Sequence, residues 1–93
     1  MEKIEKEIFG TLYNGKKYKI KNLEFNPNIL LLSGSIVIDK KYKNFYIIFG
    51  KERKIEYAHF NLGKNAGANF ENALFNFYSN IYFDIDKREI KIL

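Results

Sequence analysis

Two segments of the chain place tyrosine among lysines, in a pattern suited to binding phosphate-rich partners. They read KKYKIK at 16–21 and KKYKNFY at 40–46. Lysine ammonium groups neutralise phosphates, and an exposed aromatic ring can stack on a nucleobase. Arginine, whose planar fork reads base edges, is scarce in this chain. We therefore expect any contact with nucleic acid to depend on phosphates and to weaken as salt rises.

The cations of these segments and of the turns beside them form the predicted binding set. Tyr18 shares the apolar positions of its segment and is expected in the core, whereas Tyr42 lies in a connection and is the better candidate for stacking. The alternative interpretation is that the lysines only keep the protein in solution. The predicted partner-binding residues are Lys17, Lys19, Lys21, Lys41, Tyr42, Lys43, Arg53, Lys54 and Lys64.

A glycine-containing segment, LGKNAG at 62–67, has some features of a phosphate-binding loop. A P-loop needs lysine directly after its second glycine, followed by serine or threonine. Here Lys64 follows the first glycine, and Ala68 follows the second, so neither the lysine nor the hydroxyl residue of the motif is in place. We interpret the segment as the start of a helix that Asn65 or Asn69 caps. An anion held by the free N–H groups of that helix end, with help from Lys64, is the alternative.

No set of residues with catalytic or metal-binding spacing stands out. His59 is the only histidine and the chain has no cysteine, so His59 has no second imidazole or thiolate with which to share a metal. Its parity matches that of Ile55 and Tyr57, which predicts a place on the packed face of a sheet. Asp84 and Asp86 are expected to pair with lysines. We therefore expect a protein without enzymatic activity, metal or cofactor, and a small hydrolase or nuclease built around His59 is the alternative.

Composition predicts a single folded domain over residues 1–93. Hydrophobic residues make up 46% of the chain and aromatic residues 17%, which is enough for a packed core. The net charge of +5 is concentrated in residues 14–64, where eleven cations outnumber four carboxylates. The charged N-terminal segment MEKIEKEIFG lacks the apolar stretch of a signal peptide, and no apolar run could span a bilayer. We expect a cytoplasmic protein, in a bacterium or in the host of a phage, with no membrane partner.

The first strands are predicted to form a hairpin around Asn14-Gly15, the pair that favours a two-residue type I′ turn. That turn pairs Tyr13 with Lys16 and Phe9 with Ile20. Alternation then separates an apolar face from a basic face, on which the lysines are expected to stand together in solvent. The apolar face holds Phe9, Thr11, Tyr13, Tyr18 and Ile20, and the other holds Gly10, Leu12, Lys17, Lys19 and Lys21.

The remaining pattern predicts an α+β fold, a mainly antiparallel curled sheet of six to seven strands with one amphipathic helix on one face. Apolar residues change parity beyond Asn22, which predicts a bulge or a strand end. The helix is expected over 67–80, after five strands and before two. The last two strands form a hairpin that turns at Lys87-Arg88 and pairs Asp84 with Lys91 in a salt bridge.

Composition and motif content together indicate a binding protein. A compact basic domain without a catalytic set, encoded by AT-rich codons, is typical of phage-encoded inhibitors of bacterial nucleases, anti-CRISPR proteins included. We therefore expect a basic face that docks on an acidic protein surface, a nucleoprotein or a nuclease. Direct binding of RNA or DNA is the alternative. An edge strand such as EIKIL at 89–93 is also expected to be able to pair with a second copy or with another chain.

Overall fold

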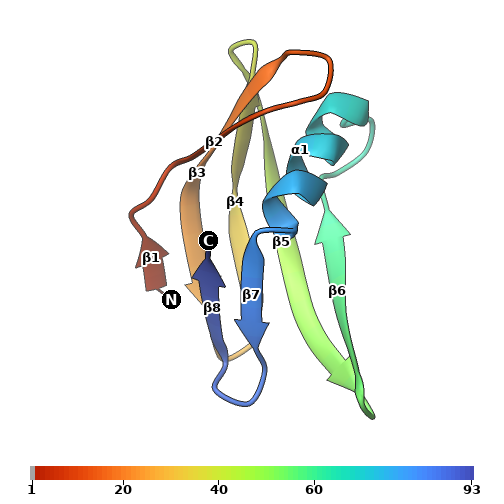
Figure 1. Ribbon diagram of the computed structural model, residues 1–93. Coiled ribbons are helices and arrows are strands. Elements are labelled where there is room, and N and C mark those ends of the chain that lie inside the picture. The colour runs from red at the N-terminus through yellow and green to blue at the C-terminus, as the bar shows by residue number, and fades with distance from the viewer. Residues whose placement is uncertain (1) are drawn as a thin grey trace.

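The computed structural model describes residues 2–93, which form eight β-strands and one α-helix in two layers (Figure 1). Six strands form the main sheet, and the helix α1 (Ala68–Tyr78) lies with a hairpin of the last two strands across one face of that sheet. The strands are β1 (Glu2–Ile4), β2 (Ile8–Thr11), β3 (Lys17–Asn26), β4 (Leu31–Ile38), β5 (Lys41–Glu52), β6 (Ile55–Asn61), β7 (Ile81–Asp84) and β8 (Glu89–Ile92).

The main sheet is antiparallel throughout, in the order β1-β3-β4-β5-β6, with β2 also paired to β3. The ten residues of β3 are enough to pair with β2 along one half and with β1 along the other. Between the halves the register with β4 shifts, and Asn22 has a φ of 57°. The bulge predicted beyond Asn22 is thus confirmed, and it keeps Leu23 and Phe25 in the core with Ile20.

The core lies between the main sheet and the layer formed by α1 and the β7–β8 hairpin. From the helix, Phe77 is fully buried, and its ring meets Phe45 edge to face with 5.8 Å between centroids. From the hairpin, Phe83 stacks on Phe49 at 4.5 Å. The predicted helix with one apolar face is therefore confirmed. We call this side of the main sheet the covered face.

The predicted α+β fold with a mainly antiparallel sheet and one helix is confirmed, but the strand count and order differ from the prediction. Residues 2–93 form eight strands, the helix follows the sixth, and β7 and β8 form a separate two-stranded sheet in the second layer. Their placement follows from the lengths of the elements. The twelve residues of β5 span about 40 Å, whereas the eleven residues of α1 span about 16 Å. The helix therefore covers only part of the apolar face, and the hairpin covers the rest.

The register of the β7–β8 hairpin differs from the predicted one by two residues, so the same side chains still share a face. Asp84 lies opposite Glu89 rather than Lys91, and the expected salt bridge does not form. The Asp84 carboxylate instead accepts hydrogen bonds from the backbone N–H groups of Asp86 and Lys87, both at 3.1 Å. These bonds stabilise the turn.

The first hairpin has a three-residue loop, and the predicted two-residue type I′ turn is wrong. The N–H of Leu12 donates to the carbonyl of Lys16 at 2.8 Å, and the N–H of Gly15 donates to the carbonyl of Leu12 at 2.9 Å. Gly15 has a φ of 85°, as a residue that follows a type I turn in such a loop requires.

The extra loop residue shifts the pairing of β2 by one position, so Phe9 lies opposite Lys19. A one-residue shift reverses the faces of a strand. Phe9, which was predicted in the core, is therefore 72% exposed, whereas Leu12 is buried. Packing selects this register, because the buried Tyr18 ring lies against Gly10, where any side chain would overlap it.

The start of α1 differs from the predicted cap. The residue before the helix is Gly67, with a φ of 91° and no side-chain hydrogen bond at the cap, so the prediction of capping by Asn65 or Asn69 is wrong. Asn69 instead accepts a hydrogen bond from the Asn14 side-chain amide at 3.0 Å. This bond connects the helix start to the loop of the first hairpin.

Candidate binding face on the open side of the sheet

The face of the main sheet opposite the core is covered by no other element of residues 2–93, and we call it the open face (Figure 1). Its side chains alternate along each strand with the buried ones. Strand pairing arranges them in rows that run across the sheet. They include Phe9, Lys17, Lys19, Lys21, Val37, Tyr42, Asn44, Tyr46, Ile48, Tyr57 and His59.

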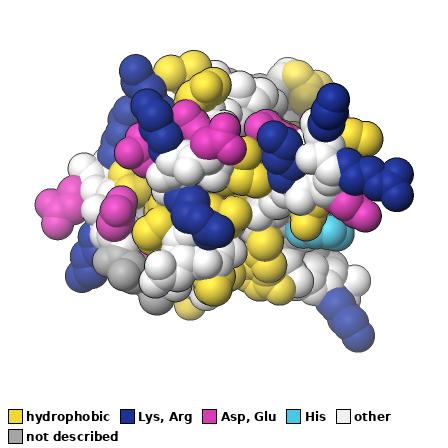
Figure 2. Space-filling view, turned by 90° about the horizontal axis from the view of Figure 1, so that it is seen from below, with side chains coloured by type: hydrophobic (Ala, Val, Ile, Leu, Met, Phe, Trp, Pro, Cys, Tyr) yellow, Lys and Arg dark blue, Asp and Glu magenta, His cyan; other side chains and the backbone are white. Residues whose placement is uncertain are grey.

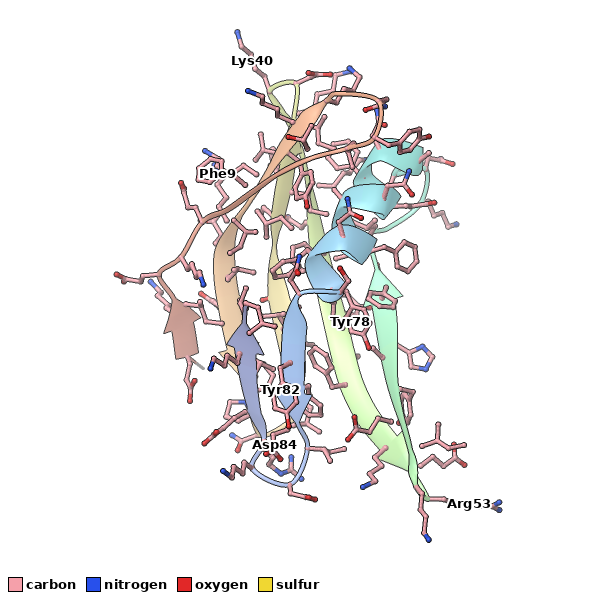
Figure 3. The ribbon with its side chains drawn as sticks, viewed as in Figure 1. Phe9, Lys40, Arg53, Tyr78, Tyr82 and Asp84 are labelled. Carbon is pink, nitrogen blue, oxygen red and sulfur yellow. The ribbon has the colours of Figure 1, made fainter. Side chains whose placement is uncertain are left out.

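One row of the open face joins two exposed aromatic rings through a lysine. Phe9 pairs with Lys19, and a single valine of β4 separates Lys19 from Tyr42. Phe9 is 72% exposed and points away from α1 (Figure 3), and Tyr42 is 66% exposed. Lys17 and Lys21 stand on either side of Lys19 on the same face of β3. We call these five residues the basic end of the open face.

Within residues 2–93, no ion pair neutralises the lysines of the basic end. In residues 2–93 the one salt bridge joins Lys16 to Asp39, outside this set. Lys21 borders a shallow hollow of about 400 Å³ that two further lysines and three glutamates also line. The three lysines therefore give the basic end a positive potential. Physiological salt screens it over about 8 Å.

Lys41, Lys43 and Lys64 lie outside the open face. Lys41 and Lys43 alternate with Tyr42 along β5, which directs them to the covered side of the sheet. There Lys41 borders a hollow of about 230 Å³ beside the start of α1. Lys64 is exposed in the connection between β6 and α1. The structure therefore does not bring these three cations together with Lys19.

Arg53 and Lys54 form the turn between β5 and β6, at the opposite end of the molecule from Lys40 (Figure 3). Figure 2, which views the molecule from the Arg53 end, shows lysine and arginine side chains next to aspartate and glutamate. This end is therefore mixed in charge, unlike the basic end. The structure does not bring Arg53 or Lys54 near Lys19.

The other half of the open face is mainly apolar. The Tyr57 ring lies across Gly50, where any side chain would overlap it, and it meets His59 edge to face at 5.7 Å. Ile48 and Ile55, on the same face, are also exposed. We call Ile48, Ile55, Tyr57 and His59 the apolar end of the open face.

His59 is exposed on the open face, so the prediction that it points to the packed face is wrong. As predicted, His59 shares a face of its strand with Ile55 and Tyr57, but that face is the open one. Within residues 2–93 its side chain makes no hydrogen bond or salt bridge to a carboxylate, and no group of three or more metal-binding side chains comes together. The surroundings of His59 therefore contain no acid–base pair.

No family model, curated protein or solved structure matches this chain. The open face therefore has to be interpreted from its own residues. Among residues 2–93, no helix is long and apolar enough to cross a membrane.

Phe9 is the candidate binding residue that sequence reasoning missed. The apolar residues of this segment occupy both parities, with Phe9 on one and Ile8 and Leu12 on the other. The predicted two-residue turn placed Phe9, rather than Ile8 and Leu12, on the core face. The signal that could have corrected the parity is Gly10, because a glycine inside a strand can mark a close approach by another group, which here is the Tyr18 ring.

Proposed function

We propose that this chain is a small non-enzymatic binding protein that docks the basic end of its open face on an acidic partner. The partner class that fits is a nucleoprotein or the nucleic-acid channel of a nuclease, which docking would inhibit, as phage-encoded inhibitors of the anti-CRISPR type do. One observation carries the proposal. Three lysines without ion pairs in residues 2–93 stand beside two exposed rings on a face that the chain leaves open.

The lysines and the rings act at different stages of binding in this proposal. The field of the lysines steers the protein toward an acidic surface and accelerates association at low salt. Phe9 and Tyr42 are then buried against the partner. A buried aromatic side chain at an interface centre contributes about 2 kcal/mol or more, whereas an exposed ion pair contributes about 0.2–1 kcal/mol. The rings therefore carry more of the affinity, and the lysines more of the association rate.

The non-enzymatic part of the proposal is supported by the surroundings of the candidate catalytic groups. A general base needs a partner that orients it within hydrogen-bond distance. His59 has an aromatic neighbour, Tyr57, and the Asp84 carboxylate is engaged by backbone N–H groups of its own turn. A nuclease activity of the purified protein that His59→Ala abolishes would contradict this part.

Direct binding of single-stranded RNA or DNA is a second candidate, favoured by the row that joins Phe9, Lys19 and Tyr42. Neighbouring strands are about 4.8 Å apart, so the two rings stand about 14 Å apart over three strand intervals. That distance is too large for one base. The rings would stack on separate bases, with Lys19 between them near the phosphates.

Two binding measurements separate these candidates. The purified protein is titrated with a fluorescent single-stranded oligonucleotide at two salt concentrations, and it is used as bait in bacterial lysate with and without nuclease treatment. Capture of a protein from nuclease-treated lysate, without oligonucleotide binding, supports the inhibitor. Tight oligonucleotide binding that salt weakens supports the second candidate. Absence of both contradicts a binding role for the basic end.

The triple variant Lys17→Glu, Lys19→Glu, Lys21→Glu tests the basic end with either partner. We expect binding to be lost because three attractive charges become repulsive, and we expect the fold to persist because these side chains face solvent. The matched control makes the same charge change at exposed lysines elsewhere, Lys51, Lys87 and Lys91. Equal affinity of the triple variant and this control would contradict the proposal.

A further inference from the structure

The outer edge of β6 has no partner strand within residues 2–93. β6 pairs with β5 from Ile55 to Asn61 without a bulge, and no strand lies on its other side (Figure 1). Alternate residues of β6 therefore direct their N–H and C=O groups away from the sheet. An edge of this kind is a template on which another strand can pair.

The opposite edge of the main sheet is protected in ways that β6 is not. There, β1 and β2 have only three and four residues, and the charged residues Glu5, Lys6 and Glu7 separate them. β6 has seven residues and contains no lysine, arginine or proline. Natural proteins place such residues, or a break, on edges that must stay unpaired. β6 therefore lacks a lysine, a proline or a break, and Glu56 is its one charged residue.

The free side of β8, which the sequence also indicated as an edge, faces another part of the same chain. Lys6 Nζ donates a hydrogen bond to the carbonyl of Ile92 at 3.2 Å. Residues of β1 and β8 together line a hollow of about 380 Å³. β8 is therefore less accessible to a second strand than β6 is.

Apolar side chains flank the β6 edge on both faces of the sheet. On the open face, Ile55 is 72% exposed and Tyr57 is 44% exposed. On the helix side, Phe60 meets the exposed Phe75 edge to face at 5.3 Å, and both rings border a hollow of about 280 Å³. A protein strand paired to β6 would bury apolar area on both faces, which favours a protein occupant over a polyanion.

We propose that the β6 edge pairs antiparallel with β6 of a second copy of this chain, which joins the two main sheets into one. A two-fold axis through Ala58 is the register that pairs all seven residues of both strands. It sets Tyr57 opposite His59 of the second copy on the open face. Within one chain these two rings already meet edge to face at 5.7 Å, so the pairing gathers four rings across the axis.

The charges of β6 allow the strand to pair with itself. Glu56 is its one carboxylate, and in the Ala58 register it lies opposite Phe60. The two Glu56 residues are then separated by four residues along the paired strands, or about 13 Å. This separation exceeds the screening length of about 8 Å at physiological salt. Two copies therefore meet at this edge without like charges opposite each other.

A single introduced cysteine tests the edge and its register, because the chain has no cysteine of its own. Ala58→Cys sets two thiols opposite each other across the axis, where paired Cα atoms are about 4.5–5.5 Å apart and within disulfide range. Ile55→Cys is the matched control on the same strand, because its two copies would be about 20 Å apart. We expect a covalent dimer on a non-reducing gel for Ala58→Cys and not for Ile55→Cys.

Sedimentation velocity over a concentration series tests the unaltered chain. As the protein concentration increases, we expect the mass to rise from the 11.1 kDa of one chain toward twice that value. Two double variants place like charges opposite each other across the axis: Tyr57→Lys with His59→Lys, and Tyr57→Glu with His59→Glu. Each should weaken dimerisation about ten-fold or more. Mixing the two variants places opposite charges across the axis and should restore a dimer that contains one copy of each. The control Tyr13→Lys with Tyr82→Lys adds the same charge at two exposed sites away from β6 and should not change the mass. Circular dichroism confirms that each variant is folded.

A mass of 11.1 kDa at every concentration would overturn the proposal, as would a dimer that neither charge variant weakens. Equal crosslinking of Ala58→Cys and Ile55→Cys would overturn the Ala58 register. The three lysines of the basic end lie on β3, with two strands between them and β6, and Tyr42 lies on β5 beyond the residues that pair with β6. Loss of dimerisation and loss of partner binding are therefore separate outcomes.

Discussion

Among the aromatic side chains of the main sheet, phenylalanine predominates on the covered face and tyrosine on the open face. Phe25, Phe45 and Phe49 are 2–4% exposed, whereas Tyr42 and Tyr46 are 66% and 38% exposed. A tyrosine can keep its hydroxyl group in water while its ring packs on a neighbour. The open face is therefore stable without a cover and still offers apolar area to a partner.

Phe9 is the exception on the open face, because it is 72% exposed and has no polar group. Full burial of such a side chain stabilises by about 1.5–3 kcal/mol, and the isolated chain gains little of this. Binding of a partner that covers Phe9 would gain this free energy of burial instead. Phenylalanine therefore stabilises the fold on the covered face and is available for binding on the open face.

The largest expected effect on stability comes from removing a buried ring beneath the covered face. Phe77→Ala should lower the free energy of unfolding by about 3–5 kcal/mol, because it removes a fully buried ring that packs on Phe45. Tyr46→Ala on the open face should cost less than about 1 kcal/mol. Urea denaturation of both variants measures the difference. Similar losses would show that the open face contributes to the core.

Two glycines lie beneath tyrosine rings, one on each face of the main sheet. Gly10→Ala should destabilise by about 1–3 kcal/mol, because the new methyl group would overlap the buried Tyr18 ring on the covered face. Gly50→Ala meets Tyr57 in the same way, but that ring is 44% exposed and can move into solvent. Thermal melts should therefore show the smaller loss for Gly50→Ala. The reverse order would contradict the assignment of the two faces.

Phe9→Ser separates binding from stability. Loss of the exposed ring should weaken partner binding about ten-fold or more, while the free energy of unfolding should change by no more than about 0.5 kcal/mol. Titration with the captured partner or the oligonucleotide measures the first quantity, and urea denaturation measures the second. Tyr13→Ser, in the hairpin loop at 90% exposure, is the control. A stability loss of several kcal/mol for Phe9→Ser would show that Phe9 packs in the core and would contradict its exposure on the open face.

The smallest expected effect concerns the cations outside the basic end. Arg53→Ala with Lys54→Ala should change affinity by less than about two-fold, because the molecule is 38 Å long and salt screens charges over about 8 Å. The same titration measures this variant beside the triple lysine variant. A loss as large as that of the triple variant would extend the binding surface to the far turn.

Local patterns in the sequence predicted much of this fold. The spacing of three and four residues predicted the helix, and the alternation along residues 17–21 set the lysines of β3 apart from Tyr18 and Ile20. The change of parity beyond Asn22 predicted the bulge. Each of these features depends on residues only a few positions apart, whose periodicity follows from backbone geometry.

The side chains that share a face of each strand can be identified from the amino-acid sequence, because alternation is a property of the strand's own backbone. The sequence did not determine which face would be covered, and that choice placed Tyr57 and His59 in solvent. Only the tertiary structure decided this, because coverage depends on where α1 and the β7–β8 hairpin lie, and those contacts join distant parts of the chain. The packing of Tyr18 on Gly10 likewise decided the register of β2, and with it the exposure of Phe9.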